Sequence, residues 1–350
     1  MKQLLLVCVS LLVFSACSGS NGPSSVAASS ASSVGGASSS VSQASSSSQG
    51  HSAYCPEGLR TVGYFPTWRG QVENIQYNYL SHILYSFLLP NDDGSLQPLS
   101  GGDGRLMQLV TLAQAAGVKV GIAIGGWNDG DDSAFVALAA DDATRAKFVA
   151  EVIAFVERYQ LDGVDMDWEH PSTPQQAAGN ALIMAELRVA LDNLEGEKFL
   201  SKAVVGAGDW AGQYILDGVL ESVDFLNLMA YDQNNNDHSS LAYAAESVEY
   251  WTNRGLTPAK INLGVPFYSQ PNWHTYRDLV AADSANACVD VVNGDYYNGI
   301  PTIRTKAAYA GSDVCGMMMW ELSQDAWGDA SLLKAMWEVV HQQPPSYVCP

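Results

Sequence analysis

Short apolar runs alternate with amphipathic stretches from about Leu59 to the C-terminal region. Each run is apolar enough to be buried on both faces, which is typical of parallel strands that lie between two layers. The pattern predicts eight strands, at Thr61–Phe65, Ile83–Phe87, Val118–Ile124, Gly163–Asp167, Ala203–Ala207, Phe225–Met229, Ile261–Val265 and Gly316–Trp320.

The stretches between these runs carry apolar residues at helical spacing. The clearest is Asp141–Tyr159, where Phe148, Val152 and Phe155 recur on one face. Further helices are expected near Leu106–Ala116, Gln176–Leu194, Leu241–Arg254, Thr302–Ala310 and Ser331–His341.

Eight strand–helix units in about 290 residues match the size of a single (β/α)₈ TIM barrel. A doubly wound sheet is the second possibility, but no glycine-rich phosphate fingerprint follows the first predicted strand. In a barrel, the active site lies at the C-terminal ends of the strands, so chemistry should be sought there.

The N-terminus reads as an export signal. Lys2 precedes the apolar run Leu4–Phe14, which is shorter than the roughly 20 residues of a membrane span. Ser15-Ala16-Cys17 resembles a bacterial lipoprotein signal, in which residues 1–16 are removed and Cys17 carries the lipid. Ser18 after the cysteine resembles signals for the outer membrane, facing the exterior or the periplasm. The alternative is ordinary cleavage and secretion.

The next segment, Ser18–Gly50, is rich in Ser, Gly and Ala, with few large apolar side chains to offset the entropy of ordering. We therefore expect a Ser-rich disordered tether over residues 17–52 and a catalytic domain over residues 53–350.

The chain has 350 residues, 47% of them hydrophobic, and a formal net charge of −20. This is enough apolar material for one large buried core. Nucleic acid is excluded as a partner because binding it requires a basic surface. A neutral substrate fits the charge better than an anionic polymer, and we expect a monomer.

Six cysteines are present, of which Cys8 falls in the signal and Cys17 is assigned to lipid. The other four form an even set in an exported protein, which predicts two disulfides. We favour Cys55–Cys349, which would join the two ends of the domain, and Cys288–Cys315, although sequence does not determine the pairing.

Three carboxylates alternate along one predicted strand and its end: Asp165, Asp167 and Glu169. Because side chains of a strand alternate between its faces, all three should point into the barrel, with Glu169 last, at the mouth. Their mutual repulsion should raise at least one pKa, so that one proton is shared, and a carboxyl that stays protonated near neutral pH can act as a general acid. A Mg²⁺ or Ca²⁺ site is the rival, but a single strand supplies ligands from one side only.

The spacing Asp162-x-x-Asp165-x-Asp167-x-Glu169 resembles the DxxDxDxE signature of glycoside hydrolase family 18, the chitinases and their relatives. Further similarities follow in chain order from Gly63 to Trp320: Gly63-Tyr64-Phe65, His82–Phe87, Ile124-Gly125-Gly126-Trp127 with Ala123 where the family usually has Ser, Met229-Ala230-Tyr231-Asp232, and Trp320.

The resemblance implies a retaining hydrolysis in which the substrate's own 2-acetamido group is the nucleophile. Glu169 would be the acid and base, Asp167 would orient the acetamido N–H, and Asp165 would share a proton with Asp167. Tyr231 would bind the acetamido oxygen, with Asp232 beside it. The resemblance implies no metal and no organic cofactor.

Aromatic residues are the second signal, because the apolar faces of pyranose rings stack on them. The chain has 9 Trp and 16 Tyr, and several fall at predicted strand ends. The resemblance places Trp320 under the sugar that is cut. We expect sugar contacts from Tyr64, Trp127, Trp210, Met229, Asp232, Tyr268 and Trp320, with Trp68, Trp273 and Trp327 in similar loops.

Three further residues are expected to have structural rather than catalytic roles. Trp168 should alternate away from the barrel interior, His170 is interpreted as loop structure, and Asn227 should face inward to support Asp232 or the core.

Many family members insert a small α+β domain between the seventh and eighth strands. Here Tyr268–Cys315 is too short for such a domain plus a helix, which predicts an open groove and endo action. The expected function is thus a chitinase that acts on chitin or chitooligosaccharides. One alternative is an endo-β-N-acetylglucosaminidase that cuts the chitobiose core of N-glycans, and another is a non-catalytic chitin-binding lectin, which the presence of Glu169 disfavours.

Overall fold

The computed structural model describes Cys55, residues 58–233 and residues 237–350. The predicted signal, the tether and Cys17 lie outside these residues. Within the part described, no helix has the length and apolar character that crossing a membrane requires.

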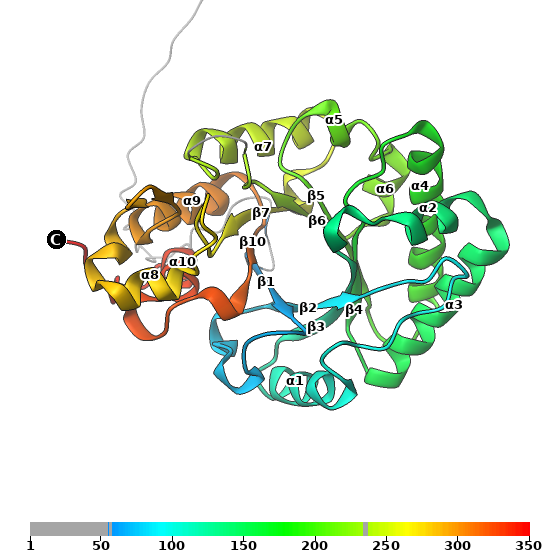
Figure 1. Ribbon diagram of the computed structural model, residues 1–350, viewed down its shortest axis with the longest axis horizontal. Coiled ribbons are helices and arrows are strands. Elements are labelled where there is room, and N and C mark those ends of the chain that lie inside the picture. Colours follow the sequence, from blue (N-terminus) through cyan, green and yellow to red (C-terminus); the bar gives the residue numbers. More distant parts are fainter. Residues whose placement is uncertain (1–54, 56–57, 234–236) are drawn as a thin grey trace, which may run out of the picture. The chain divides into compact units, whose positions relative to one another are not determined.

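Eight parallel strands close into a barrel, in the order β1-β10-β7-β6-β5-β4-β3-β2 (Figure 1). This confirms the predicted (β/α)₈ fold. The strands are β1 Arg60–Pro66, β2 His82–Leu88, β3 Lys119–Gly125, β4 Gly163–Asp167, β5 Phe199–Val205, β6 Phe225–Met229, β7 Ile261–Pro266 and β10 Gly316–Trp320.

Helices surround the barrel (Figure 1). They are α1 Asp103–Ala115, α2 Ser133–Ala140, α3 Asp142–Tyr159, α4 Pro174–Asp192, α5 Asp209–Gly212, α6 Asp217–Ser222, α7 Leu241–Asn253, α8 Tyr276–Ala282, α9 Ile300–Asp313 and α10 Leu332–Val340. Their starts follow ordinary capping rules: Asp141 accepts from Thr144 N at 2.8 Å, and Thr173 caps α4 just before a proline at its first position.

Apolar side chains form two clusters, one between barrel and helices and one inside the barrel. The inner cluster comprises Val62, Tyr64, Leu84, Ala123, Phe199, Phe225, Tyr231, Tyr268 and Met318. Three members of this inner cluster, Tyr64, Tyr231 and Tyr268, also line the cleft described below.

The connection between β7 and β10 carries more structure than the sequence predicted. It contains α8, a small antiparallel hairpin of β8 Val291–Val292 and β9 Asp295–Tyr296, and then α9. The hairpin is far shorter than a domain, and its backbone pairs with the cleft wall, where Gln270 N donates to Tyr296 O at 2.9 Å.

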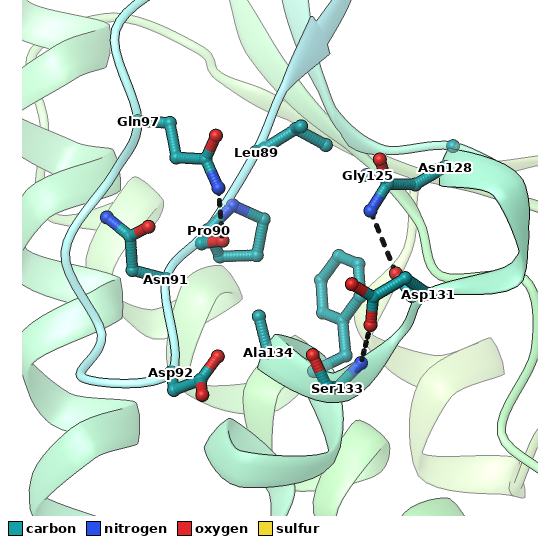
Figure 2. A pocket seen from close by; sticks show the side chains of 12 residues that line it. Leu89, Pro90, Asn91, Asp92, Gln97, Gly125, Asn128, Asp131, Ser133 and Ala134 are labelled. Carbon is teal, nitrogen blue, oxygen red and sulfur yellow. Dashed lines mark hydrogen bonds between the residues drawn. The ribbon is translucent and has the colours of Figure 1, made fainter.

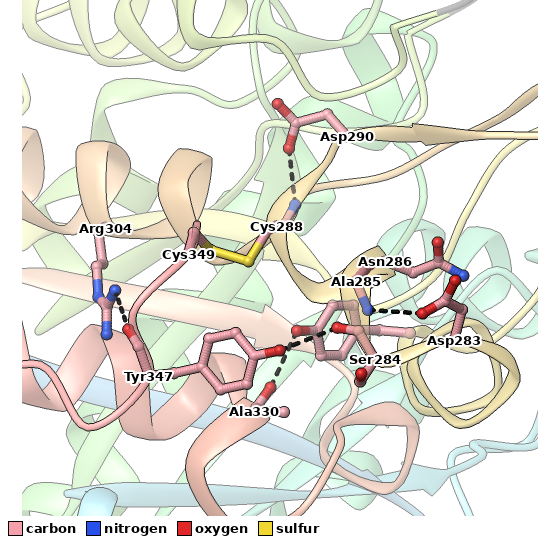
Figure 3. The surroundings of a disulfide bond; sticks show 12 residues. Asp283, Ser284, Ala285, Asn286, Cys288, Asp290, Arg304, Ala330, Tyr347 and Cys349 are labelled. Carbon is pink, nitrogen blue, oxygen red and sulfur yellow. Dashed lines mark hydrogen bonds between the residues drawn. A yellow bond between two sulfur atoms is a disulfide. The ribbon is translucent and has the colours of Figure 1, made fainter.

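The disulfides join Cys55 to Cys315 and Cys288 to Cys349, so the pairing favoured from sequence is wrong although all four cysteines are bonded. Cys55 lies beside the start of β10, because Arg60 N, at the start of β1, donates to Cys315 O at 2.9 Å. The C-terminal segment instead runs past α9 to η5 Ser284–Cys288. Figure 3 shows Tyr347 donating to Ser284 O (3.0 Å) and accepting from Arg304 (2.8 Å), which brings Cys349 to Cys288.

Candidate active site

Strand β4 directs two carboxylates into the barrel. Asp165 is paired in register with Ala123 of β3 and Ser201 of β5, and Asp167 with Gly125 of β3. Both aspartates are buried, and Glu169 follows at the upper end, with a side chain 16% exposed. The predicted alternation of the three acids is therefore confirmed.

Asp165 lies at the bottom of the acidic row and is surrounded by donors. Its carboxylate accepts hydrogen bonds from Tyr64 OH (2.7 Å), Ser201 Oγ (2.6 Å) and Asn227 Nδ2 (3.2 Å). Burial raises the pKa of Asp165, while these three bonds oppose the rise by stabilising the ionised form. Asp165 is thus an acid held in place by three donors, beneath the acid that faces the cleft.

Two asparagine side chains form a hydrogen-bonded chain that fixes Asn227, one of the three donors to Asp165. Asn227 accepts from Asn262 Nδ2 at 2.9 Å, and Asn262 accepts from Arg60 Nε at 2.9 Å. Asn227 therefore faces inward, as expected, but supports Asp165 and not Asp232. Neither Ser201 nor Asn262 was predicted from the sequence. Asn262 lies within the predicted strand Ile261–Val265, whose alternation could have identified it, whereas Ser201 precedes the predicted fifth strand.

Asp167 lies above Asp165 and has a free acceptor. Its Oδ1 is buried and has no hydrogen-bond partner among the described residues, and no hydrogen bond among them joins it to Asp165. Burial, followed by the charges of Glu169 and Asp165, raises the pKa of Asp167 well above its usual range. Asp167 thus favours its protonated form more than an exposed aspartate does, and it lines the cleft with one oxygen that has no partner in the described structure.

Glu169 occupies the cleft side of the row. Burial raises its pKa to about 7; the Lys202 charge opposes the rise and the Asp232 charge adds to it. The imidazole of His170 lies 3.9 Å from its Oε2, but burial lowers the pKa of His170 to about 3 and leaves the ring neutral. Glu169 is therefore a carboxyl that can donate a proton near pH 7.

Tyr231 and Asp232 follow strand β6 and enter the same cleft. Asp232 accepts from Tyr268 OH (2.7 Å) and Gln270 Nε2 (3.0 Å) and lies 3.3 Å from His238 Nδ1. Burial raises its pKa, but the bonds from these three groups outweigh burial and lower it overall. Asp232 is thus an ionised acceptor, and His238 and Gln270 are supporting residues that the motif did not reveal.

Aromatic rings line a cleft of about 1160 Å³ above these groups. Trp320 at the end of β10 stacks on Phe87 at 5.6 Å and 16°, and Trp273 stacks on Tyr268 at 5.2 Å and 10°. Exposed rings extend along the cleft. All seven residues expected to contact sugar line it, as do Trp68 and Trp273: Tyr64, Trp68, Trp127, Trp210, Met229, Asp232, Tyr268, Trp273 and Trp320.

Trp127 is positioned by the two glycines that end β3. Gly125 has φ +109° and Gly126 has φ +89°, conformations that side chains rarely tolerate. A Cβ on Gly126 would lie 2.4 Å from the Phe87 ring, and Gly126 N donates to Asp167 O at 2.8 Å. The turn thus places an exposed indole next to the carboxylate strand.

A small pocket lies behind this turn (Figure 2). Asn128 Nδ2 donates to Asp131 O at 2.9 Å, and Asp131 Oδ1 accepts from Ser133 N at 3.2 Å. Figure 2 shows these bonds linking the turn to the start of α2, so the pocket forms part of the support for the Trp127 loop.

Three of the residues considered from the sequence lie away from the acidic row. Trp168 is fully buried, stacks on Phe135 and donates to Asp132, which confirms its packing role. Asp162 accepts from Val120 N at 2.7 Å, at the opposite end of β4. Trp327 does not line the cleft but covers Arg277, at 4.9 Å. His170 lines the cleft and contacts Trp210, beyond the loop role expected of it.

The rival interpretation from the sequence was a metal site on the acidic row. In the described part of the chain, no three His, Cys, Asp or Glu side chains are grouped so that they could hold a metal ion. The arrangement offers a protonated carboxyl at the cleft, a second acid with a free oxygen next to it, and a third acid held in place beneath, which suits acid–base chemistry on a neutral ligand.

Comparisons with known proteins agree with this geometry. The model of the family "Glycosyl hydrolases family 18" matches residues 60–325. "Chitinase 1" of Aphanocladium album is 26% identical over 79% of this chain and 84% of its own length. The GH18 chitinase ChiB from the chitin utilization locus of Flavobacterium johnsoniae is 27% identical, with a TM-score of 0.71, over 81% of this chain and 94% of that structure. A chitinase from Bacteroides thetaiotaomicron, at 24% identity and a TM-score of 0.71, covers 81% and 96% and shares the fold.

Proposed function

This chain belongs to glycosyl hydrolases family 18 and is a glycoside hydrolase, and we propose that it is a chitinase that cuts β-1,4 linkages between N-acetylglucosamine units. One observation carries the proposal. A carboxyl with a pKa of about 7, Glu169, lies beside the buried Asp167 with its free Oδ1, in a cleft lined by tryptophans. This arrangement fits a neutral sugar polymer that brings its own acetamido nucleophile.

In the first step, Glu169 gives its proton to the glycosidic oxygen, and the bond from that oxygen to the anomeric carbon breaks. The acetamido carbonyl oxygen of the same sugar attacks the anomeric carbon and forms a cyclic oxazolinium ion. The departing chain leaves with the proton. Tyr231, which lines the cleft, binds the acetamido oxygen, and Asp232 binds beside it.

Asp167 stabilises the cation that forms. Its free Oδ1 accepts the acetamido N–H, and a negative charge on this carboxyl offsets the positive ring. This charge requires that a proton shared by the two aspartates lie on Asp165 when the oxazolinium ion forms. In the second step, the ionised Glu169 takes a proton from a water molecule, and the oxygen of that water attacks the anomeric carbon. The bond from the anomeric carbon to the acetamido oxygen breaks at the same time, which restores the neutral acetamido group. Two successive inversions at this carbon leave the configuration retained.

The shape of the cleft supports endo action on chains that extend past both sides of Glu169. Trp127 and Trp273 are 62% and 60% exposed, and the described connection between β7 and β10 contributes to the cleft lining only Tyr268, Gln270 and Trp273. Rings this exposed can stack on sugar faces of a polymer that enters sideways.

Release of a fluorophore from di- and tri-N-acetylchitooligosaccharide glycosides, measured across pH, tests the proposal. We expect kcat/KM to fall about tenfold per pH unit above about pH 7, because Glu169 must hold its proton to act as the acid and its pKa is about 7. Activity that stays constant to pH 9 would contradict the assignment of Glu169. No activity on either substrate would overturn the chitinase proposal, and cleavage of a high-mannose N-glycan would then indicate an endo-β-N-acetylglucosaminidase.

Export is part of the proposal. The disulfides Cys55–Cys315 and Cys288–Cys349 are typical of proteins that fold outside the cytosol. We further propose lipid attachment at Cys17 with the Ser-rich segment as a tether. Cys17→Ala should move the expressed protein from the detergent-soluble membrane fraction to the aqueous fraction. If wild type and variant both partition into the aqueous fraction, the chain is secreted without lipid.

A further inference from the structure

Lys202 on β5 is a lysine with no exposed surface. Its neighbour Ser201 points into the barrel, where its hydroxyl binds Asp165. Because strand residues alternate, Lys202 points to the outer side, where it lies in register with Met166 of β4. It is therefore placed between the barrel and the helices, directly behind the strand that carries the acids.

The ammonium group of Lys202 has no hydrogen-bond partner in the part of the chain that the structure describes. A second buried lysine, Lys306, differs sharply, because its Nζ donates to Ser239 O (2.7 Å), Ser239 Oγ (2.8 Å) and Asn298 Oδ1 (2.7 Å). A buried charge without partners is costly. At Lys202 that cost must be offset by charges at longer range.

The groups whose ionised forms attract Lys202 are the three acids of the site. Burial lowers the pKa of Lys202 to about 8, while Asp167, Asp165 and Glu169 oppose this, so the side chain is cationic at neutral pH. Burial, followed by the charge of Lys202, lowers the pKa of His170 to about 3, so this ring is neutral.

Neighbouring elements hold their own charges in other contacts. On α4, Glu186 is bound to Arg145 and Arg188 to Asp224. On α5, Asp209 accepts from Tyr250. Strand β6, Phe225–Met229, has no titratable side chain. The charge of Lys202 therefore interacts mainly with Asp165, Asp167 and Glu169.

We propose that Lys202 is a positioning residue whose positive charge, placed on the outer face of the sheet, limits how many protons the Asp165–Asp167–Glu169 row holds and so sets the pH range of the reaction. A cation inside the barrel would occupy the space that the sugar needs, whereas one behind the strand leaves the cleft free. The inference rests on the proposed function, because the pH range is measured on chitooligosaccharide hydrolysis.

The test compares pH profiles of kcat/KM for wild type and Lys202→Met, which keeps an unbranched side chain of nearly the same length and removes its charge. Both limbs of the variant's profile should move to higher pH by about one unit, the effect of one charge several ångströms away at an effective dielectric near 20. Lys202→Leu should show the same shift. Lys198→Met is the matched control: its Nζ binds Leu161 O at the far end of the same strand, and its profile should not move.

A second readout does not depend on activity. The folded-state pKa of Lys202 lies below the ordinary 10.5, so the unfolded chain binds more protons between about pH 8 and 10.5 and stability from this group rises with pH there. Urea unfolding should show this rise in wild type and its loss in Lys202→Met.

The outcomes of the two tests are distinct. If the pH profiles of kcat/KM coincide for wild type and Lys202→Met, the inference is overturned and the chitinase proposal is unaffected. An inactive wild type would defeat the chitinase proposal, and the unfolding series would then decide whether Lys202 is a buried charge.

Discussion

Replacing Glu169 by glutamine is expected to lower kcat/KM on chitooligosaccharides by a factor on the order of 10²–10⁴. Glutamine keeps the size of the side chain and can still hydrogen-bond the glycosidic oxygen, but it has no proton of suitable acidity to transfer. Bond breaking would then have to proceed without protonation of the leaving chain. Initial rates of fluorophore release, with substrate affinity measured separately by calorimetry, check the prediction.

The same substitution should stabilise the protein at alkaline pH. The pKa of Glu169 rises from an ordinary 4.5 to about 7 on folding, so the folded state binds more protons than the unfolded chain across that interval. Stability therefore falls as pH increases from 4.5 to 7, by up to about 3 kcal/mol in total. Glutamine does not titrate, and urea unfolding at pH 8 should show Glu169→Gln to be the more stable protein.

Glu186→Gln provides the matched control for both measurements. Glu186 is on α4, outside the cleft, where it pairs with Arg145 at 2.8 Å. Its substitution should leave kcat/KM within about twofold of wild type, since a partly exposed ion pair contributes little. A Glu169→Gln enzyme that retained more than a tenth of wild-type activity would show that another group supplies the proton.

The strands were predictable because each is an apolar run bounded by polar turns. Seven of the predicted runs overlap their strands almost completely, but the fifth was placed at Ala203–Ala207, whereas β5 is Phe199–Val205. The error follows from Ser201 and Lys202, which are polar and interrupt the apolar pattern although both are buried. A sequence pattern cannot tell a buried polar residue from a loop residue when its partner lies on a different strand.

The acids of the site were predictable for a different reason. Asp165, Asp167 and Glu169 lie on one strand, so their relation follows from local geometry alone. Their supports come from β1, β5 and β6, more than 30 positions away in the chain, and the barrel has to close before Tyr64, Ser201 and Asn227 meet Asp165.

The predicted disulfide pairing was wrong for a similar reason, because it depends on contacts between distant parts of the chain. The favoured pairing assumed that the two ends of the domain meet, whereas Cys55 lies next to β10 and the C-terminal segment packs near η5. Which cysteines approach each other depends on how the final helix docks, and spacing along the chain holds no information about that.

Asp167→Asn is expected to lower kcat/KM by a factor on the order of 10²–10³ on N-acetylated substrates, the size of effect found when a group that stabilises a charged transition state is removed. Asp167 Oδ1 is buried and has no hydrogen-bond partner in the described structure, so it is free to accept the acetamido N–H. Asparagine has nearly the same shape, but it cannot become negative and therefore cannot offset an oxazolinium ion.

Asp162→Asn is the matched control, because it makes the same change on the same segment at the opposite end of the barrel. The amide oxygen can still accept from Val120 N, and activity should remain within about twofold of wild type.

Added azide distinguishes attack by the acetamido group of the substrate from covalent attack by Asp167. If Asp167 were instead a covalent nucleophile, azide would take its place in Asp167→Asn and restore turnover as a glycosyl azide. Under the acetamido mechanism the nucleophile is still on the substrate, so azide should restore nothing, and recovery of rate with a glycosyl azide product would refute the role assigned to Asp167.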